Sequence, residues 1–210
     1  MARVDGGCPQ GIVSAEIQSA KEALRRTLLA QLAKHPLTEQ TAASERIRQR
    51  LVEHPHWREA KTVLLYASIR GEPDLNPLLQ LALKAGKVIA LPRYVAARQC
   101  YEAAQIIDAQ RDLRAGMFGV PEPSPEAPVL PLNQLDLALV PGVGFDQSGR
   151  RLGRGKGFYD RLLPEVRGIK CGVAFDFQVI AQPVPAESHD VHLDCILTPS
   201  RWWFVAPQAV

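Results

Sequence analysis

Apolar residues near the start of the chain recur at helical spacing. Leu24, Leu28 and Leu32 fall on one stripe, which predicts a helix over residues 14–35. A second helix should begin with Thr38 as its N-cap and cover residues 38–54, because a proline follows at that point. The chain is therefore expected to open with two helices in succession.

Beyond residue 60, short apolar runs alternate with helical segments. Five prolines within residues 117–131 predict a loop that crosses the molecule. We expect strands at 62–67, 88–91, 100–107, 136–140, 169–175 and 195–198, and helices at 76–85 and 158–163. This alternation predicts an α/β fold, with a mainly parallel sheet and helices on both of its faces. Ligands of such sheets bind outside the carboxyl ends of the strands.

Length, composition and charge narrow the class of protein. A chain of 210 residues can form one well-cored domain, which we place at residues 15–205, after a flexible extension over residues 1–14. A net charge of only +3 argues against nucleic acid as a partner. No apolar run approaches the roughly 20 residues of a membrane span, and no targeting segment is evident, so we expect a cytoplasmic protein. We also expect a monomer.

A glycine-rich basic stretch at residues 139–163 is the most distinctive part of the chain. It holds the following glycines and cations: Gly142, Gly144, Gly149, Gly153, Gly155, Gly157, Arg150, Arg151, Arg154 and Lys156. Glycine permits positive φ and close approach of a ligand to the main chain, and exposed N–H groups and cations then favour phosphate. The spacing matches neither the Walker loop nor the dinucleotide fingerprint. A glycine-rich turn with solvated charges is the alternative interpretation.

Other polar residues lie where they could join this loop. Lys21 and Arg25 share a face with the leucine stripe, so they either cover apolar surface or reach a polyphosphate. Glu72 follows a buried strand, where it can bind the N–H donors of a heterocycle or complement the dipole of the next helix. Asp160 and Asp194 are candidate magnesium ligands, and Asp194 could instead cap the start of a strand. No arrangement typical of a covalent nucleophile stands out.

The loop sequence PGVGFDQSGRRLGRGKGFYD closely resembles the signature of the 5-formyltetrahydrofolate cyclo-ligase family, also called 5,10-methenyltetrahydrofolate synthetases. The resemblance covers roughly residues 15–200. Weaker matches follow in order: K-x-x-x-R at 21–25, YASIRGE at 66–72, LPRY at 91–94, G-x-x-E-P at 119–123 and an aspartate before the last strand at 194. One departure is Phe158, where many members have tyrosine.

The resemblance implies a fold and a reaction. The fold would be a three-layer architecture like that of the NagB/RpiA/CoA-transferase proteins. The reaction would be the ATP- and Mg²⁺-dependent conversion of 5-formyltetrahydrofolate to 5,10-methenyltetrahydrofolate. In-line phosphoryl transfer needs positioning and neutralisation of charge more than a covalent residue. A non-catalytic nucleotide or folate binder, or a small-molecule kinase, would use a similar scaffold.

The resemblance also implies a role for each matching residue. Arg154 and Lys156 should be catalytic and face the transferred phosphoryl group. ATP should be bound by Lys21, Arg25, Arg151, Leu152, Gly153, Arg154, Gly155, Lys156, Gly157, Phe158 and Tyr159. The folate should contact Ala67, Glu72, Arg154, Gly155, Lys156, Gly157 and Phe158. Magnesium should be held by Asp160 and Asp194.

Overall fold

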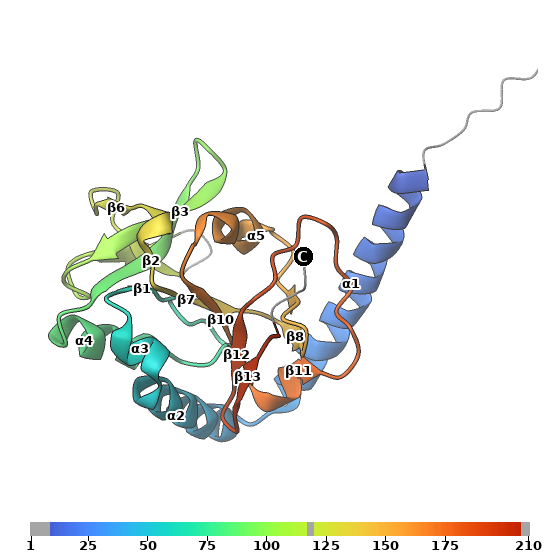
Figure 1. The fold of residues 1–210 in the computed structure, drawn as a ribbon, viewed down its shortest axis with the longest axis horizontal. Helices are drawn as coiled ribbons and strands as arrows, with labels where there is room; N and C mark the ends of the chain where they lie inside the picture. Colours follow the sequence, from blue (N-terminus) through green and yellow to red (C-terminus); the bar gives the residue numbers. More distant parts are fainter. Residues whose placement is uncertain (1–8, 117–119, 207–210) are drawn as a thin grey trace, which may run out of the picture.

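The computed structural model describes residues 9–116 and 120–206, and an eight-stranded sheet lies at its centre (Figure 1). The strand order is β13-β12-β10-β7-β1-β2-β3-β6. The strands are β1 (Thr62–Leu64), β2 (Val88–Val95), β3 (Cys100–Ile106), β6 (Val129–Leu130), β7 (Leu137–Pro141), β10 (Ile169–Val173), β12 (Cys195–Leu197) and β13 (Trp202–Phe204). The five from β12 to β2 are parallel, and β13, β3 and β6 pair antiparallel. The expected mainly parallel sheet is confirmed.

Alternating side chains on the central strands divide the core between the two faces of the sheet. Leu137 and Leu139 of β7 pack in one cluster with α2 (Leu37–Glu53), α3 (Pro55–Glu59) and α4 (Asn76–Lys84). Ala138 and Val140 point to the other face, which α5 (Phe158–Leu162) and the 3-10 turn η3 (Leu163–Glu165) cover. Figure 1 shows α2, α3 and α4 together on one side of the sheet and α5 on the other. Helices on both faces are thus confirmed.

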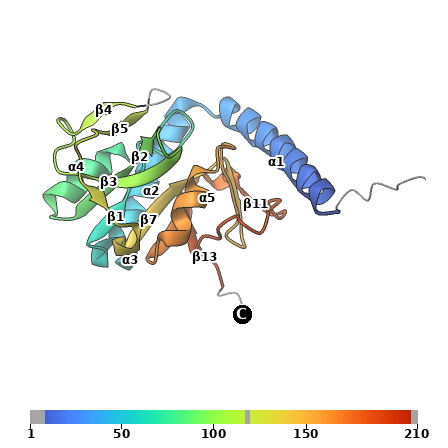
Figure 2. The same ribbon diagram turned by 90° about the horizontal axis from the view of Figure 1, so that it is seen from above.

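The first helix packs beside a second, smaller sheet. Strands β11 (Val179–Ile180), β8 (Gly144–Asp146) and β9 (Arg151–Leu152) form this sheet, and Leu28 of α1 (Pro9–Lys34) packs against Val143, Leu152 and Val184 beside it. Figure 2 shows the early turns of α1 projecting from the body of the molecule. The helix begins at Pro9 and not at Ser14, so residues 9–14 of the expected flexible extension are helical; residues 1–8 lie outside the described ranges.

Several element boundaries differ from those expected. α2 begins at Leu37 after Pro36, so Thr38 is not its N-cap. β2 continues through Pro92, because its pairing with β1 ends at Ala90 and no donor is needed on that side beyond it. The proline-rich stretch forms β5 (Pro121–Pro123), which pairs with β4 (Leu113–Ala115), and residues 117–119 of it lie outside the description. Two further 3-10 turns are η2 (Leu132–Gln134) and η4 (Asp176–Gln178).

Candidate active site

A cleft opens at the carboxyl ends of the central parallel strands. Ala67 lies just past β1, Pro92 lies toward the end of β2, and Pro141 ends β7. Two cavities meet there, of about 670 and 890 Å³ with part of each open to solvent, and they share Glu72 and Tyr159 among their lining residues. They form one continuous cleft at the position where α/β sheets bind ligands.

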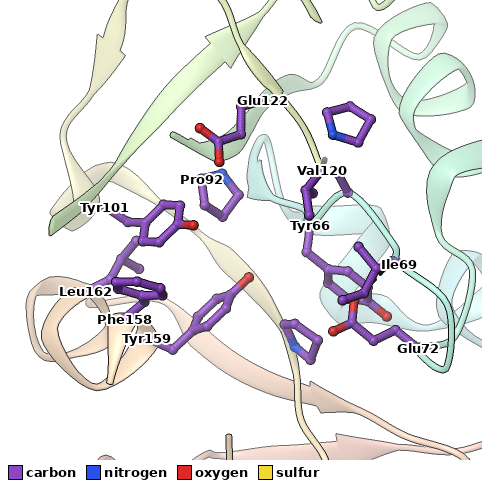
Figure 3. Close-up of a pocket in the computed structure, with 13 residues that line it drawn as sticks. Tyr66, Ile69, Glu72, Pro92, Tyr101, Val120, Glu122, Phe158, Tyr159 and Leu162 are labelled. Carbon is purple, nitrogen blue, oxygen red and sulfur yellow. Dashed lines mark hydrogen bonds between the residues drawn. The ribbon is translucent and has the colours of Figure 1, made fainter. Parts of the chain in front are cut away.

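The first part of the cleft is apolar and lined by aromatic side chains. Its walls include Tyr66, Ala67, Pro92, Tyr101, Phe158 and Tyr159. In Figure 3 the hydroxyls of Tyr101 and Tyr159 point toward the middle of the pocket. Burial raises the pKa of both tyrosines, so their hydroxyls stay protonated and can donate hydrogen bonds at neutral pH. The Phe158 ring packs edge-on against Tyr101, with 4.5 Å between ring centroids.

The second part of the cleft is cationic and is built from the glycine loop. Gly155 and Gly157 have φ of 91° and 62°, a backbone conformation that glycine adopts without steric cost. Arg154 and Lys156 alternate with these glycines and are exposed in the cleft. Arg25 donates from Nε to the carbonyl of Gly153 at 2.9 Å, which ties α1 to the loop. The loop can therefore surround an anion with main-chain N–H groups and cations.

Glu72 joins the two parts of the cleft. Its side chain is buried, one carboxylate oxygen accepts a hydrogen bond from Arg154 Nε at 3.3 Å, and the other accepts from the Ile69 N–H at 3.3 Å. Burial raises the pKa of Glu72, and the Arg154 guanidinium opposes that rise. Glu72 therefore belongs to the wall of the cleft. Its carboxylate is directed to Arg154 and Ile69 and is not used to cap α4.

The two predicted magnesium ligands lie at opposite ends of the parallel strands. Asp160 faces the cationic part of the cleft and pairs with Arg151 at 2.8 Å. Asp194 precedes β12, accepts the Lys170 N–H at 2.7 Å and shares a depression with Asp136 at the amino ends of the strands. The structure therefore does not bring Asp160 and Asp194 together, as their shared role as magnesium ligands would require. Within residues 9–116 and 120–206, no three His, Cys, Asp or Glu side chains group as metal ligands.

Lys21, a residue of α1, is buried in an ion-pair network with carboxylates of residues 187–190. Its Nζ lies 2.6 Å from Asp190 Oδ2 and 3.2 Å from Glu187 Oε2. Ser14 and Gln18 also donate to the Glu187 carboxylate, which fixes the first half of α1 against residues 187–190. Hydrogen bonds from Ser14 and Lys21 lower the pKa of Glu187. Of the two basic residues on this helix, Arg25 reaches the glycine loop and Lys21 is neutralised by carboxylates.

All but two of the remaining predicted residues line the cleft, and the exceptions are Leu152 and Gly155. Arg151, Gly153 and Gly157 line the cleft with Arg154 and Lys156. The Leu152 side chain is buried in the core against α1, and Gly155 faces the Arg25 guanidinium. Six further residues line the cleft without having been given a role from the sequence: Tyr66, Ile69, Pro92, Tyr101, Glu122 and Leu162. The matches at 66–72, 91–94 and 119–123 contain the first three and Glu122, whereas Tyr101 and Leu162 lie outside every match.

An apolar pocket with hydrogen-bonding walls, continuous with a cationic glycine loop, defines an α/β protein that binds a ring compound beside a phosphate group. The described helices all lack the combination of length and apolar character that spanning a bilayer requires. The fold and the site thus give the general class of protein, and comparison with known proteins identifies the family.

A family model described as the 5-formyltetrahydrofolate cyclo-ligase family matches residues 17–199. The 5-formyltetrahydrofolate cyclo-ligase of Escherichia coli K12 is 34% identical over 162 residues, which are 73% of this chain and 86% of that protein. The 5,10-methenyltetrahydrofolate synthetase of Aquifex aeolicus has a similar structure, with a TM-score of 0.81 at 34% identity over 90% of this chain and 95% of the other. The Mycoplasma pneumoniae synthetase gives 0.69 at 27% identity, over 85% and 98%. This chain belongs to the 5-formyltetrahydrofolate cyclo-ligase family.

Proposed function

We propose that this protein converts 5-formyltetrahydrofolate to 5,10-methenyltetrahydrofolate, with ATP as co-substrate and Mg²⁺ as the metal. Membership of the cyclo-ligase family supports the reaction. The observation that carries it is the continuity of the cleft, because an aromatic pocket opens directly onto the glycine loop. A ring bound in the first part would present its formyl group to a phosphate bound in the second.

The chemistry follows from activation of a poor leaving group. The γ-phosphoryl group of ATP passes to the formyl oxygen on N5, which gives ADP and an iminium phosphate. N10 then attacks the formyl carbon and loses its proton, and the C–O bond breaks to release inorganic phosphate. Phosphate leaves far more readily than hydroxide would. No step needs a covalent enzyme intermediate, in agreement with a site rich in cations and N–H donors.

The cations near the glycine loop and Glu72 have separate roles in this proposal. Arg154 and Lys156 neutralise the charge of the transferred phosphoryl group, and Arg25 and Arg151 add positive charge around the other phosphates. Glu72 binds N–H donors of the pterin ring while its pairing with Arg154 keeps that arginine oriented. For Lys21 to bind ATP, phosphate oxygens must replace Glu187 and Asp190 as its partners.

Of the two predicted magnesium ligands, Asp160 is the one that lies in the cleft. This carboxylate lines the cationic part of the cleft, and Mg²⁺ in phosphoryl-transfer sites commonly uses one or two carboxylates together with phosphate oxygens and water. When bound, the ion neutralises charge on the phosphates. Asp160 would then exchange its pairing with Arg151 for the metal, which would free that guanidinium for phosphate.

We also retain three finer expectations as proposals. The architecture is that of the NagB/RpiA/CoA-transferase proteins, the protein acts as a monomer, and it works in the cytoplasm. One relative, from Arabidopsis thaliana, is named as mitochondrial, so location can differ among family members.

The test is near-ultraviolet absorbance with 5-formyltetrahydrofolate, ATP and Mg²⁺, and with controls that each lack one of them. We expect the methenyl chromophore to appear only when all three are present. A folded protein that binds ATP and produces no chromophore would contradict the proposal. Folate binding without turnover would favour a non-catalytic binder, and phosphorylation of another acceptor would favour a kinase.

A further inference from the structure

Glu122 is a second buried carboxylate in the apolar part of the cleft. It lies on β5, and only 8% of the residue is exposed. Figure 3 shows Glu122 and Glu72 on opposite sides of the pocket, and the hydroxyls of Tyr101 and Tyr159 pointing into it from a third side. The pocket therefore offers hydrogen-bond acceptors from two opposed walls.

The two carboxylates differ in what compensates their charge. Glu72 has Arg154 at 3.3 Å, whereas no described cation lies within ion-pairing distance of Glu122. One hydrogen bond to Glu122 occurs among the described residues, from the Tyr94 N–H to Oε2 at 3.1 Å, and Oε1 has no protein partner there. Burial raises the pKa of Glu122. A buried carboxyl group without a cation lowers stability, so its presence in a ligand pocket indicates a function.

A glycine holds the Glu122 side chain in place. A Cβ added to Gly116, just past β4, would lie 2.4 Å from Cγ and 2.5 Å from Cδ of Glu122. The absence of a side chain at this position lets the backbone pack directly on the glutamate. The β4–β5 pair continues there through the Gly116 N–H, which donates to the Val120 carbonyl at 2.9 Å. The carboxyl group is thus fixed from two sides, by the backbone at Gly116 and by the Tyr94 N–H.

We propose that Glu122 is a substrate-recognition residue that binds N–H donors of the ring system in the cleft, on the edge opposite to the one that Glu72 binds. The inference rests on the proposed function and adds a specificity residue to it. A reduced pterin carries ring N–H and amino donors on more than one edge, so one carboxylate cannot reach them all. A ring without donors on the second edge would leave Glu122 buried and unpaired, which gives selectivity.

Glu122→Gln tests this proposal, because glutamine keeps an oxygen for the Tyr94 N–H and replaces the other acceptor with a donor. We expect KM for 5-formyltetrahydrofolate, and its Kd measured by calorimetry without ATP, to rise about tenfold or more. The KM for ATP should stay close to wild type, and the Tm should not fall below that of the wild type. Glu45→Gln, at an exposed position on α2, is the matched control and should change none of these values.

Gly116→Ala is a second and independent variant. It keeps the carboxylate and displaces it, so it should raise the KM and Kd for the folate and leave the KM for ATP unchanged. If Glu122→Gln does not fold, Gly116→Ala decides. A purely structural role would lower Tm in either variant with equal effects on both substrates, and that result would overturn the proposal.

A folded Glu122→Gln protein whose folate KM and Kd match wild type would also overturn it. Turnover by the wild type is measured alongside. If the wild type binds the folate without turnover and Glu122→Gln loses that binding, the proposed reaction fails and the role of Glu122 stands.

Discussion

The two parts of the cleft are built in different ways. Apart from Gly142, the residues that line only the cationic part come from one continuous stretch, residues 151–160, in which glycines alternate with arginine and lysine. The apolar part gathers side chains from the ends of β1 and β2, from β3, from β5 and from α5. The first part serves the charge of the phosphates, and the second positions a ring. Substitutions should therefore separate into effects on phosphoryl transfer and effects on binding of the ring.

Lys156→Ala should have the largest effect. Lys156 is exposed in the cleft, so its loss should leave Tm unchanged. Removal of a charge that stabilises the transferred phosphoryl group should lower kcat by about a hundred- to a thousandfold or more. Steady-state kinetics with 5-formyltetrahydrofolate and ATP measure this, with Lys84→Ala on α4 as an exposed control. Rates like those of the wild type would remove Lys156 from the mechanism.

Asp160→Asn and Asp194→Asn compare the metal dependence of a carboxylate at the carboxyl ends of the strands with that of one at the amino ends. Asp160 lines the cationic part of the cleft, so its substitution should shift the midpoint of a Mg²⁺ titration of activity to a concentration about tenfold higher or more. Asp194 lies at the amino ends of the strands and should give an unchanged titration. If Asp194→Asn shifted the midpoint and Asp160→Asn did not, the metal would have to be placed elsewhere.

The smallest expected effect is on stability, and it concerns the apolar part. Because the pKa of Glu122 is raised in the folded state, the folded protein holds this proton more tightly than the unfolded chain does. The associated stability is present below the ordinary glutamate pKa and is lost as pH rises through the raised value. Above that window Glu122→Gln should therefore melt at a higher temperature than wild type, and the difference should shrink in acid.

Thermal unfolding across pH 4 to 9, a range set about the ordinary glutamate pKa, measures this difference. Glu45→Gln should parallel wild type throughout. The opposite result would be a Tm of Glu122→Gln that lies below that of the wild type at high pH and approaches it as the pH falls. That result would show that Glu122 stabilises the fold as a carboxylate. The expected sign fits a residue retained for binding at some expense of stability.

Local sequence patterns were enough to predict much of the fold and the cationic part of the site. The central strands and α4 were predicted because their apolar spacing is set within a few residues. The same holds for the glycine loop, which follows β7 directly, and for Glu72, which lies in the connection between β1 and α4. The β8–β9 hairpin was missed, because two- and three-residue strands leave no periodicity. Asp146 defines that turn by accepting the N–H groups of Ser148 and Arg150.

Asp194 and Glu122 show two different reasons for failure. Asp194 directly precedes β12, which is a parallel strand, so it lies at the amino ends of the strands. Because ligands bind at the carboxyl ends, strand direction alone could have excluded Asp194 from the cleft. Glu122 could not have been placed in this way. Its position depends on the pairing of β4 with β5 and on Tyr94 from β2, contacts between segments that the sequence pattern does not relate.

The aromatic residues of the chain are sorted between the cleft and the rest of the molecule. Tyr66, Tyr101 and Tyr159 line the pocket, and Tyr94, the fourth tyrosine, packs against Phe158 there. The three tryptophans lie elsewhere, at α3 and on β13. Difference absorbance of tyrosine should therefore follow occupancy of the cleft, and tryptophan emission should follow unfolding. The protein carries two optical reporters at separate positions, without any added label.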